Sequence, residues 1–295
     1  MSTATLIDPV ESNSGNFSCL LPEKIVPLTD GQLEIWLGAM MSDEASSAYN
    51  LLTSLHLKGP LDNEALERAI QGAVDRFDAL RATISEDGRY MRIAPKLELE
   101  LPLIDLSRES GSIHEHRLAE LEKAEVETPF DLVRGPLIRV KIVRLALDRH
   151  VILITPHHIV FDGWSRQVML KELGEAYSAS SQGVSRQISA PALFSEYAER
   201  QSAAKDGEEF AQSKAYWLDQ LSWRLPVLDL PSDRPRSPQR TYKSSREKLF
   251  LQSDTVKELK RIAAKQRSSV HTLLLSAYQA FLYLLTGQSD LLVGI

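Results

Sequence analysis

Four residues near the middle of the chain have types and a spacing that point to catalysis. His157 and His158 are adjacent, and Asp162 and Gly163 follow a few positions later. The imidazole group has the ordinary side-chain pKa nearest neutrality, so it suits general-base chemistry. Asp162 is near enough in sequence to orient an imidazole, or to pair with a distant arginine and brace the loop. Gly163 allows a backbone angle, or a close approach, that a Cβ atom would block.

The segments on either side of the histidine pair predict how it is positioned. Residues 151–155 are nearly all apolar, which indicates a strand buried on both faces that ends just before the pair. Residues 137–145 alternate and form a hairpin with it in the middle of a sheet. Because neighbouring residues of an extended chain point to opposite sides, one histidine faces a cavity while the other packs or hydrogen-bonds. Asp162 or Ser165 starts the next helix.

Two other interpretations of the histidine pair compete with catalysis. A histidine at a strand end is often a satisfied polar residue, although two together before Asp-Gly favour a function. Histidine is also a common metal ligand. A metal site is disfavoured because strand neighbours point apart and no second cluster of histidines or cysteines supplies further ligands. The single cysteine, Cys19, lies in a polar stretch without an obvious base nearby, so it is not expected to be a nucleophile.

Composition limits the class of protein. The 295 residues fit one large or two ordinary domains, and 43% hydrophobic with 25% charged residues is ordinary globular usage. A net charge of −6 gives no overall footprint for nucleic acid. No apolar run approaches the roughly 20 residues that span a bilayer, and the first 19 residues lack a signal-peptide pattern. One cysteine cannot form an internal disulfide, which suits a cytoplasmic protein.

Hydrophobic periodicity and turn residues predict the other elements of the chain. The predicted strands are 50–57, 80–84, 90–93, 246–251 and 291–294. The predicted helices begin at Thr29 or Asp30 and at Asp62, and cover 112–127, 192–201, 211–220, 255–266 and 270–286. The proline-dense stretch 230–238 is predicted to connect two lobes.

The segment 157–165, which includes Trp164 and Ser165, resembles the HHxxxDG motif of the condensation domains of nonribosomal peptide synthetases. Their superfamily includes chloramphenicol acetyltransferase and dihydrolipoyl acyltransferases. Other stretches from about residue 25 to 295 are similar to further family motifs: Gln32 with Trp36, Arg76 with Leu80 and Arg81, 130–137, 216–217, 230–235 and 286–290. The sequence departs from the usual motifs at Phe77, Ala82, Pro156 and Arg200.

The resemblance implies an α/β fold (an α+β sandwich), with one chloramphenicol acetyltransferase-like lobe and part of a second similar lobe. Residues 1–24 are then a flexible leader and a possible docking tail, and 25–180 form the lobe that carries the motif. Residues 181–240 form a helical and proline-rich connection, and 241–295 begin a truncated C-terminal lobe. The family unit is longer, and the resemblance implies that its later part carries an arginine that pairs with Asp162.

The resemblance also implies a function. A condensation domain forms an amide bond between a donor acyl thioester and an acceptor amine, both held on 4'-phosphopantetheine arms of carrier domains. These carriers approach opposite faces of a tunnel and bring their groups to His158, which acts as a base or as a positioning group. His157, Asp162, Gly163, Trp164 and Ser165 support the motif. No metal or directly bound cofactor is expected, and further synthetase domains are expected C-terminal to this segment.

Alternatives within and outside the superfamily remain. An acyltransferase that uses a free alcohol or amine is the nearest enzyme alternative. An epimerase is disfavoured because Arg166, where epimerases usually have tryptophan, follows Ser165, and a cyclase is disfavoured because His157 is not aspartate. The non-enzyme alternative is a truncated lobe that binds carrier domains without turnover. The isolated 295 residues are expected to be inactive, with exposed apolar surface on residues 270–285.

Overall fold

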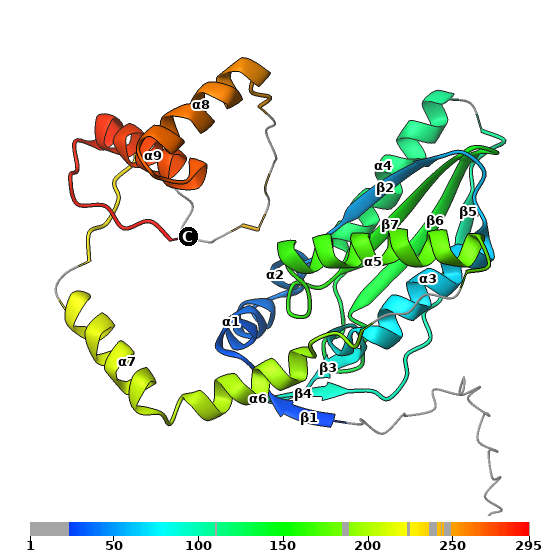
Figure 1. Cartoon of the computed structure of the whole chain (residues 1–295), viewed down its shortest axis with the longest axis horizontal. Coiled ribbons are helices and arrows are strands. Elements are labelled where there is room, and N and C mark those ends of the chain that lie inside the picture. Colours follow the sequence, from blue (N-terminus) through cyan, green and yellow to red (C-terminus); the bar gives the residue numbers. More distant parts are fainter. Residues whose placement is uncertain are drawn as a thin grey trace, which may run out of the picture. The chain divides into compact units, whose positions relative to one another are not determined.

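The computed structural model describes residues 24–109, 111–184, 189–222, 225–235, 241–242, 244 and 249–294 (Figure 1). The chain divides into two compact units, Met1–Ala204 and Lys205–Ile295. The predicted leader lies outside the described residues except for Lys24, which begins a strand, and Cys19 lies outside them as well.

A four-stranded sheet forms the centre of the first unit, in the order β2-β7-β6-β5. These strands are β2 (Thr53–Lys58), β5 (Leu103–Asp105), β6 (Ile138–Ala146) and β7 (Arg149–Pro156). The hairpin of β6 and β7 is confirmed, and β7 is antiparallel to both of its neighbours. β5 is a short parallel edge strand that periodicity did not indicate.

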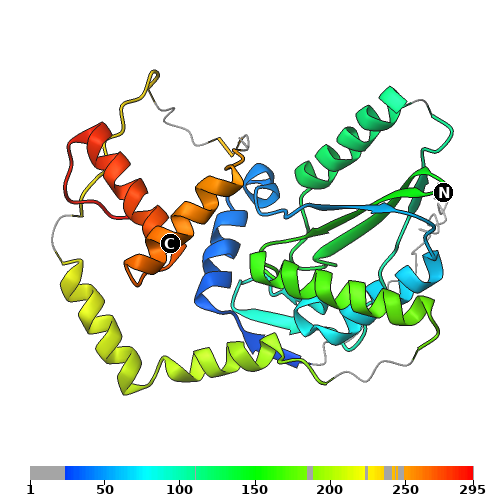
Figure 2. The ribbon, with the colours of Figure 1, turned by 45° about the horizontal axis from the view of Figure 1, so that its top comes forward.

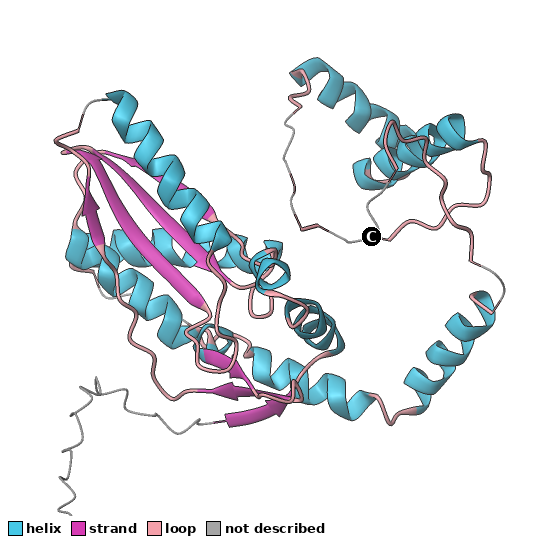
Figure 3. Ribbon diagram, turned by 180° about the vertical axis from the view of Figure 1, so that it is seen from behind, coloured by secondary structure: helices cyan, strands magenta, loops and turns pink. Residues whose placement is uncertain are grey.

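Helices cover both faces of this sheet. Helices α3 (Asn63–Arg76) and α5 (Gly163–Ser181) lie together on one face (Figure 2). Helix α4 (Gly111–Glu127) lies on the opposite face, as the view from behind shows (Figure 3). Ile152 and Ile154 of β7 pack into the core under α3 and α5, whereas Val151 and Leu153 pack into the core under α4. β7 is therefore buried on both faces, as its apolar sequence predicts.

A smaller sheet and short helices complete the first unit. The three-stranded sheet β1-β4-β3 consists of β1 (Lys24–Pro27), β3 (Ala82–Ile84) and β4 (Tyr90–Ile93). The helical segments are α1 (Asp30–Ala39), α2 (Asp43–Ser47), the 3₁₀ turn η1 (Asp78–Arg81) and α6 (Phe194–Ala204).

Helix α1 begins where the sequence predicts, and part of its apolar side is exposed. Thr29 and Gln32 form a reciprocal capping box at its N-terminus. Leu33 and the C-cap residue Met40 are exposed, and the buried residues of the helix are Gln32 and Ala39. The helix is therefore fixed by its capping residues as much as by apolar packing.

Helix α6 packs with the first unit, although the sequence predicts that it belongs to the connection. The buried carboxylate of Asp78 accepts hydrogen bonds from the backbone N–H groups of Phe194 (2.9 Å) and Ser195 (3.0 Å). These are the first two residues of α6, whose N–H groups have no partner within the helix. The boundaries of the two acetyltransferase-like lobes stay predictions.

The second unit contains α7 (Glu208–Gln220), α8 (Ser253–Lys265) and α9 (Val270–Thr286). Gly287 ends α9 with a φ of 70°, which favours glycine. Most apolar side chains of α9 are exposed, although Leu282 is buried. The strands predicted at 246–251 and 291–294 are wrong where the structure describes them, because residues 249–251 and 291–294 have no strand partner to supply ladder hydrogen bonds. Residues 246–248 lie outside the described part.

Candidate functional site

The histidine pair lies at the end of the central strand β7. The backbone N–H of His157 donates to the carbonyl of Leu137 (2.9 Å), and His157 also forms a β-bridge with Asn50. The N–H of His158 donates to the carbonyl of Tyr49 (2.9 Å). A turn follows, in which Val160 donates to the carbonyl of His157. The backbone of His157 is therefore held on both sides by the sheet and its extension, and the backbone of His158 is held on the side of Tyr49.

The side chain of His157 is fully buried. The centroid of its ring lies 5.9 Å from the ring centroids of Tyr49 and of Phe130, and the contact with Phe130 is edge-on. Its Nδ1 accepts a hydrogen bond from the N–H of Ile159 (3.2 Å). Burial lowers the pKa of His157 to about 4, with smaller contributions from His158 and Arg139, and the backbone of Ser46 opposes the shift. His157 is therefore neutral at pH 7, with its proton on Nε2.

His158 has a different environment. It is half-buried, and its Nδ1 lies below the surface without a hydrogen-bond partner among the described residues. One imidazole thus packs in the core and its neighbour has access to solvent, which agrees with the alternation expected at a strand end. Of the two residues, His158 is therefore the one that is partly exposed.

Gln32 braces the turn that follows the pair. Its side-chain Nε2 donates to the carbonyl of Ile159 (2.9 Å), and its Oε1 accepts from the N–H of Thr29 (3.2 Å). Gln32 is buried and lies 127 residues before its partner, so sequence reasoning gave it no role. The signal available was a polar residue on the inner side of a capped helix, within a stretch that is similar to a family motif.

Asp162 caps helix α5. Its carboxylate accepts from the N–H (2.7 Å) and the hydroxyl (2.6 Å) of Ser165. Burial by itself raises the pKa of Asp162, but these hydrogen bonds and the nearby His158 outweigh it, so the pKa is lowered. Within the described residues Asp162 has no ion pair, and its direct role is to start the helix.

The two residues after Asp162 are open to solvent. Gly163 does not have a positive φ, and a Cβ at this position would meet no atom within 4 Å. The expected special backbone angle is therefore wrong, while the close approach of a ligand stays a prediction. The side chain of Trp164 is 74% exposed. Both residues lie in the first turn of α5.

A cluster of charged residues lies on the α4 side of the sheet, and Arg139 connects it to the pair. The carboxylate of Glu125 is buried and pairs with Arg139 (3.1 Å) and Lys141 (2.7 Å), both on β6. The guanidinium of Arg139 lies over the ring of Phe130, 3.8 Å from its centroid. Phe130 in turn contacts the ring of His157. Sequence reasoning assigned no role to this cluster, because it joins residues from three separate elements.

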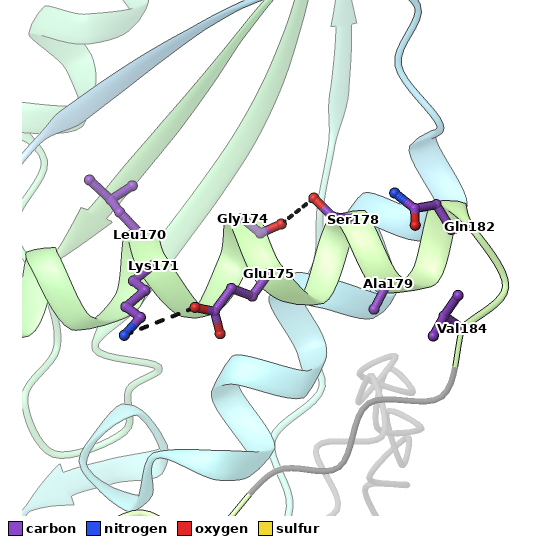
Figure 4. A pocket seen from close by; sticks show the side chains of 8 residues that line it. All are labelled: Leu170, Lys171, Gly174, Glu175, Ser178, Ala179, Gln182 and Val184. Atoms are coloured by element: carbon purple, nitrogen blue, oxygen red, sulfur yellow. Dashed lines mark hydrogen bonds and ion pairs between the residues drawn. The ribbon is translucent and has the colours of Figure 1, made fainter.

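A surface hollow along the outer side of α5 is unrelated to the motif. It lies between Leu170 and Val184, where Lys171 pairs with Glu175 and Ser178 donates to the carbonyl of Gly174 (Figure 4). None of the motif residues lines it. Among the described residues no group of three or more His, Cys, Asp or Glu side chains could hold a metal ion. None of the described helices combines the length and the apolar composition of a membrane-spanning segment.

Two synthase chains are among the curated proteins that are similar to this chain. A linear gramicidin synthase chain of Brevibacillus parabrevis is 34% identical over 272 residues, which cover 91% of this chain and 4% of that protein. A plipastatin synthase chain of Bacillus subtilis (strain 168) is 32% identical over 275 residues, which cover 92% of this chain and 7% of that protein. The present chain thus spans a small part of the length of these relatives.

Solved structures share the fold. The cyclization-docking bidomain of EpoB from Sorangium cellulosum aligns with a TM-score of 0.78 at 24% identity, over 90% of this chain and 52% of that one. The first condensation domain of the calcium-dependent antibiotic synthetase, solved with a substrate analogue, aligns with a TM-score of 0.71 at 24% identity, over 92% of this chain and 63% of that one. The family model for the condensation domain matches residues 22–295, and the chain therefore belongs to the condensation domain family.

Proposed function

We propose that this domain forms an amide bond between a donor acyl thioester and an acceptor amine, each carried on the phosphopantetheine arm of a carrier domain. The observation that carries the proposal is the contrast between the two imidazoles at the end of β7. His157 is buried and neutral, whereas His158 has access to solvent. Family membership and the similarity to gramicidin and plipastatin synthases support the same chemistry.

The proposed reaction needs one proton acceptor and accurate placement. The amine nitrogen attacks the thioester carbonyl, the C–S bond breaks, the sulfur leaves on the donor arm and the nitrogen loses a proton. His158 takes that proton or holds the amine in line with the carbonyl. General-base assistance contributes typically about 10²- to 10⁴-fold. Placement of two tethered reactants supplies much of the remaining acceleration.

The other motif residues have supporting roles in this proposal. His157 anchors the strand end, Asp162 and Ser165 start α5, and Gly163 and the exposed Trp164 form the first turn of α5 after the pair. The partners are the donor and acceptor carrier domains and further synthetase domains, which is the context of the matched relatives. The arms of the carriers bring the phosphopantetheine, and we place the reaction in the cytoplasm.

The test uses a chain of full condensation-domain length that includes this sequence, with an acyl-loaded donor carrier and an aminoacyl-loaded acceptor carrier. Mass spectrometry of the acceptor arm measures amide formation. His158→Ala is expected to lower the rate by about 10²-fold or more. The control is His116→Ala, on the exposed surface of α4.

Two results would count against the proposal. Equal rates for the parent and His158→Ala would remove the assigned role of His158. Turnover of free coenzyme A thioesters with no need for carriers would favour the superfamily acyltransferase instead.

A rate that rises with pH in the parent and loses this dependence in His158→Ala would identify a base, whereas a uniform loss at all pH values would identify a positioning group.

A further inference from the structure

We propose that Arg139 is a positioning residue for the histidine pair, a role that rests on the proposed function of His158. Arg139 lies on β6, outside the motif, and its guanidinium forms two separate links to His157. One link runs through an aromatic ring and the other through the backbone. Together they fix the ring and the main chain of the residue next to His158.

The first link is a stack of three groups. The guanidinium lies 3.8 Å from the centroid of the Phe130 ring, and the Phe130 ring meets the His157 ring edge-to-face at 5.9 Å and 81°. A cation over an aromatic face is attractive, and edge-to-face contact between rings is favourable. Because the His157 ring also lies against Tyr49 and accepts from Ile159, the stack leaves it one orientation.

The second link runs through a shared carbonyl. Arg139 donates to the carbonyl oxygens of Glu125 (2.9 Å) and Thr128 (3.0 Å). The side-chain amide of Asn50 donates to the same Thr128 carbonyl (2.8 Å) and to that of Val126 (2.9 Å). Asn50 forms the β-bridge with His157. The end of α4, the start of β2 and the end of β7 are therefore joined at one point.

The carboxylate of Glu125 keeps Arg139 in place. Its side chain is 3% exposed and contacts the Arg139 Nε at 3.1 Å. Planar guanidinium presents donors in several directions at once, so one arginine serves the carboxylate, both carbonyls and the ring face. A lysine has a single ammonium group and cannot make this set of contacts. The position therefore requires arginine for its geometry as well as for its charge.

Lys141 provides a matched control within the same cluster. It lies two residues further along β6, and its ammonium contacts the same carboxylate at 2.7 Å with a similar side-chain exposure (30% against 24% for Arg139). It has no contact with Phe130 and no hydrogen bond to the carbonyls at the end of α4 among the described residues. Loss of either cation leaves Glu125 with one cationic partner, but only loss of Arg139 removes both links to His157.

The experiment compares Arg139→Met, Arg139→Lys and Lys141→Met in the carrier assay. We expect Arg139→Met to lower kcat by about 10- to 100-fold, as a small misplacement of a catalytic group does, with KM for the loaded carriers changed by less than about twofold. Arg139→Lys is expected to recover part of the loss, and Lys141→Met to match the parent. Equal kcat values for Arg139→Met and Lys141→Met would overturn the proposal.

A spectroscopic measurement makes the result independent of turnover. Nitrogen-15 spectra of the histidine rings report the tautomer and titration of His157, whose signal is assigned with His157→Gln. We expect Arg139→Met to change both, with the pKa of His157 raised because a nearby cation is lost, and Lys141→Met to change neither. An unchanged His157 signal in Arg139→Met would refute the coupling. If Arg139→Met fails to fold, Phe130→Leu breaks the same stack while it keeps the cation, and it must change the tautomer signal of His157.

The two proposals fail in different ways. An inactive parent whose His157 signal still responds to Arg139→Met would reject the proposed function and leave the coupling intact. An active parent that requires His158 but tolerates Arg139→Met would reject the role of Arg139 alone.

Discussion

Acidification should destabilise the first unit through His157, because this imidazole is buried as the neutral species. Its pKa is lowered from 6.5 to about 4 by burial. In the unfolded chain the ring binds a proton as the pH falls below about 6.5, whereas in the folded state it stays neutral until about pH 4. The unfolded state therefore binds more protons than the folded state in this window. The free energy of unfolding consequently decreases as the pH is lowered.

The size of the effect follows from the two pKa values. Between pH 8 and pH 5 the linkage relation gives a loss of about 2 kcal/mol, and the full loss, reached below pH 4, is about 3 kcal/mol. Urea unfolding followed by circular dichroism at pH 8 and pH 5 measures it. With a typical slope of about 2 kcal/mol per molar urea, the midpoint should fall by about 1 M.

Variants separate His157 from the other titrating groups. His157→Gln should be less stable than the parent at pH 8, and should lose about 2 kcal/mol less on going to pH 5. His116→Gln should keep the pH dependence of the parent, because 75% of the His116 side chain is exposed in the folded state. The window stays above the ordinary pKa of carboxyl groups, so Glu125 and Asp162 contribute little. Burial also lowers the pKa of His150, and its contribution is the same in the parent and in His157→Gln. Parallel pH dependences of the parent and His157→Gln would refute the reasoning.

Three further changes test the supports of the site. Gln32→Leu should lower the free energy of unfolding, measured with urea, by about 1–3 kcal/mol, because the buried carbonyl of Ile159 loses its donor. An equal effect of Glu34→Leu, on the exposed side of α1, would contradict this prediction. Asp162→Ala should lower the free energy of thermal unfolding by about 1 kcal/mol. Asp162→Asn should lower it far less, since asparagine also caps helices. Equal losses of stability in the two variants would show that the cap is not the stabilising feature. Asp78→Ala should speed proteolysis within α6, because the helix loses both acceptors at its N-terminus, and an unchanged digestion pattern would argue that other contacts hold α6.

Much of the site could be predicted from local sequence. A run of apolar residues predicts a buried strand, and the two histidines that follow the run lie at the end of this strand. Because side chains along a strand alternate between its two faces, the two imidazoles are expected to point to opposite sides. Asp162 before a helical pattern predicts an N-cap, and the structure has this cap. These inferences succeed because each depends on residues within a few positions of one another. The family motif adds the expected chemistry without further structural information.

Local sequence could not decide whether the strands expected in the second unit form. Residues 249–251 and 291–294 have apolar sequences suited to strands, but the structure forms none there. A strand gains its hydrogen bonds from a neighbouring strand, so its formation depends on a partner that local sequence does not supply. Helices α8 and α9 were predictable because their hydrogen bonds are internal.

The sequence by itself determined that a histidine pair ends a buried strand and that Asp162 starts the helix after it. The tertiary structure decided which imidazole is buried, since the cavity filled by His157 is built by Tyr49 and Phe130 from distant segments. It also decided that Gln32 and Arg139 brace the pair. Contacts of this kind join residues tens of positions apart, and the physical reason they escape the sequence is that periodicity reports which face of an element is buried but not which side chains meet there.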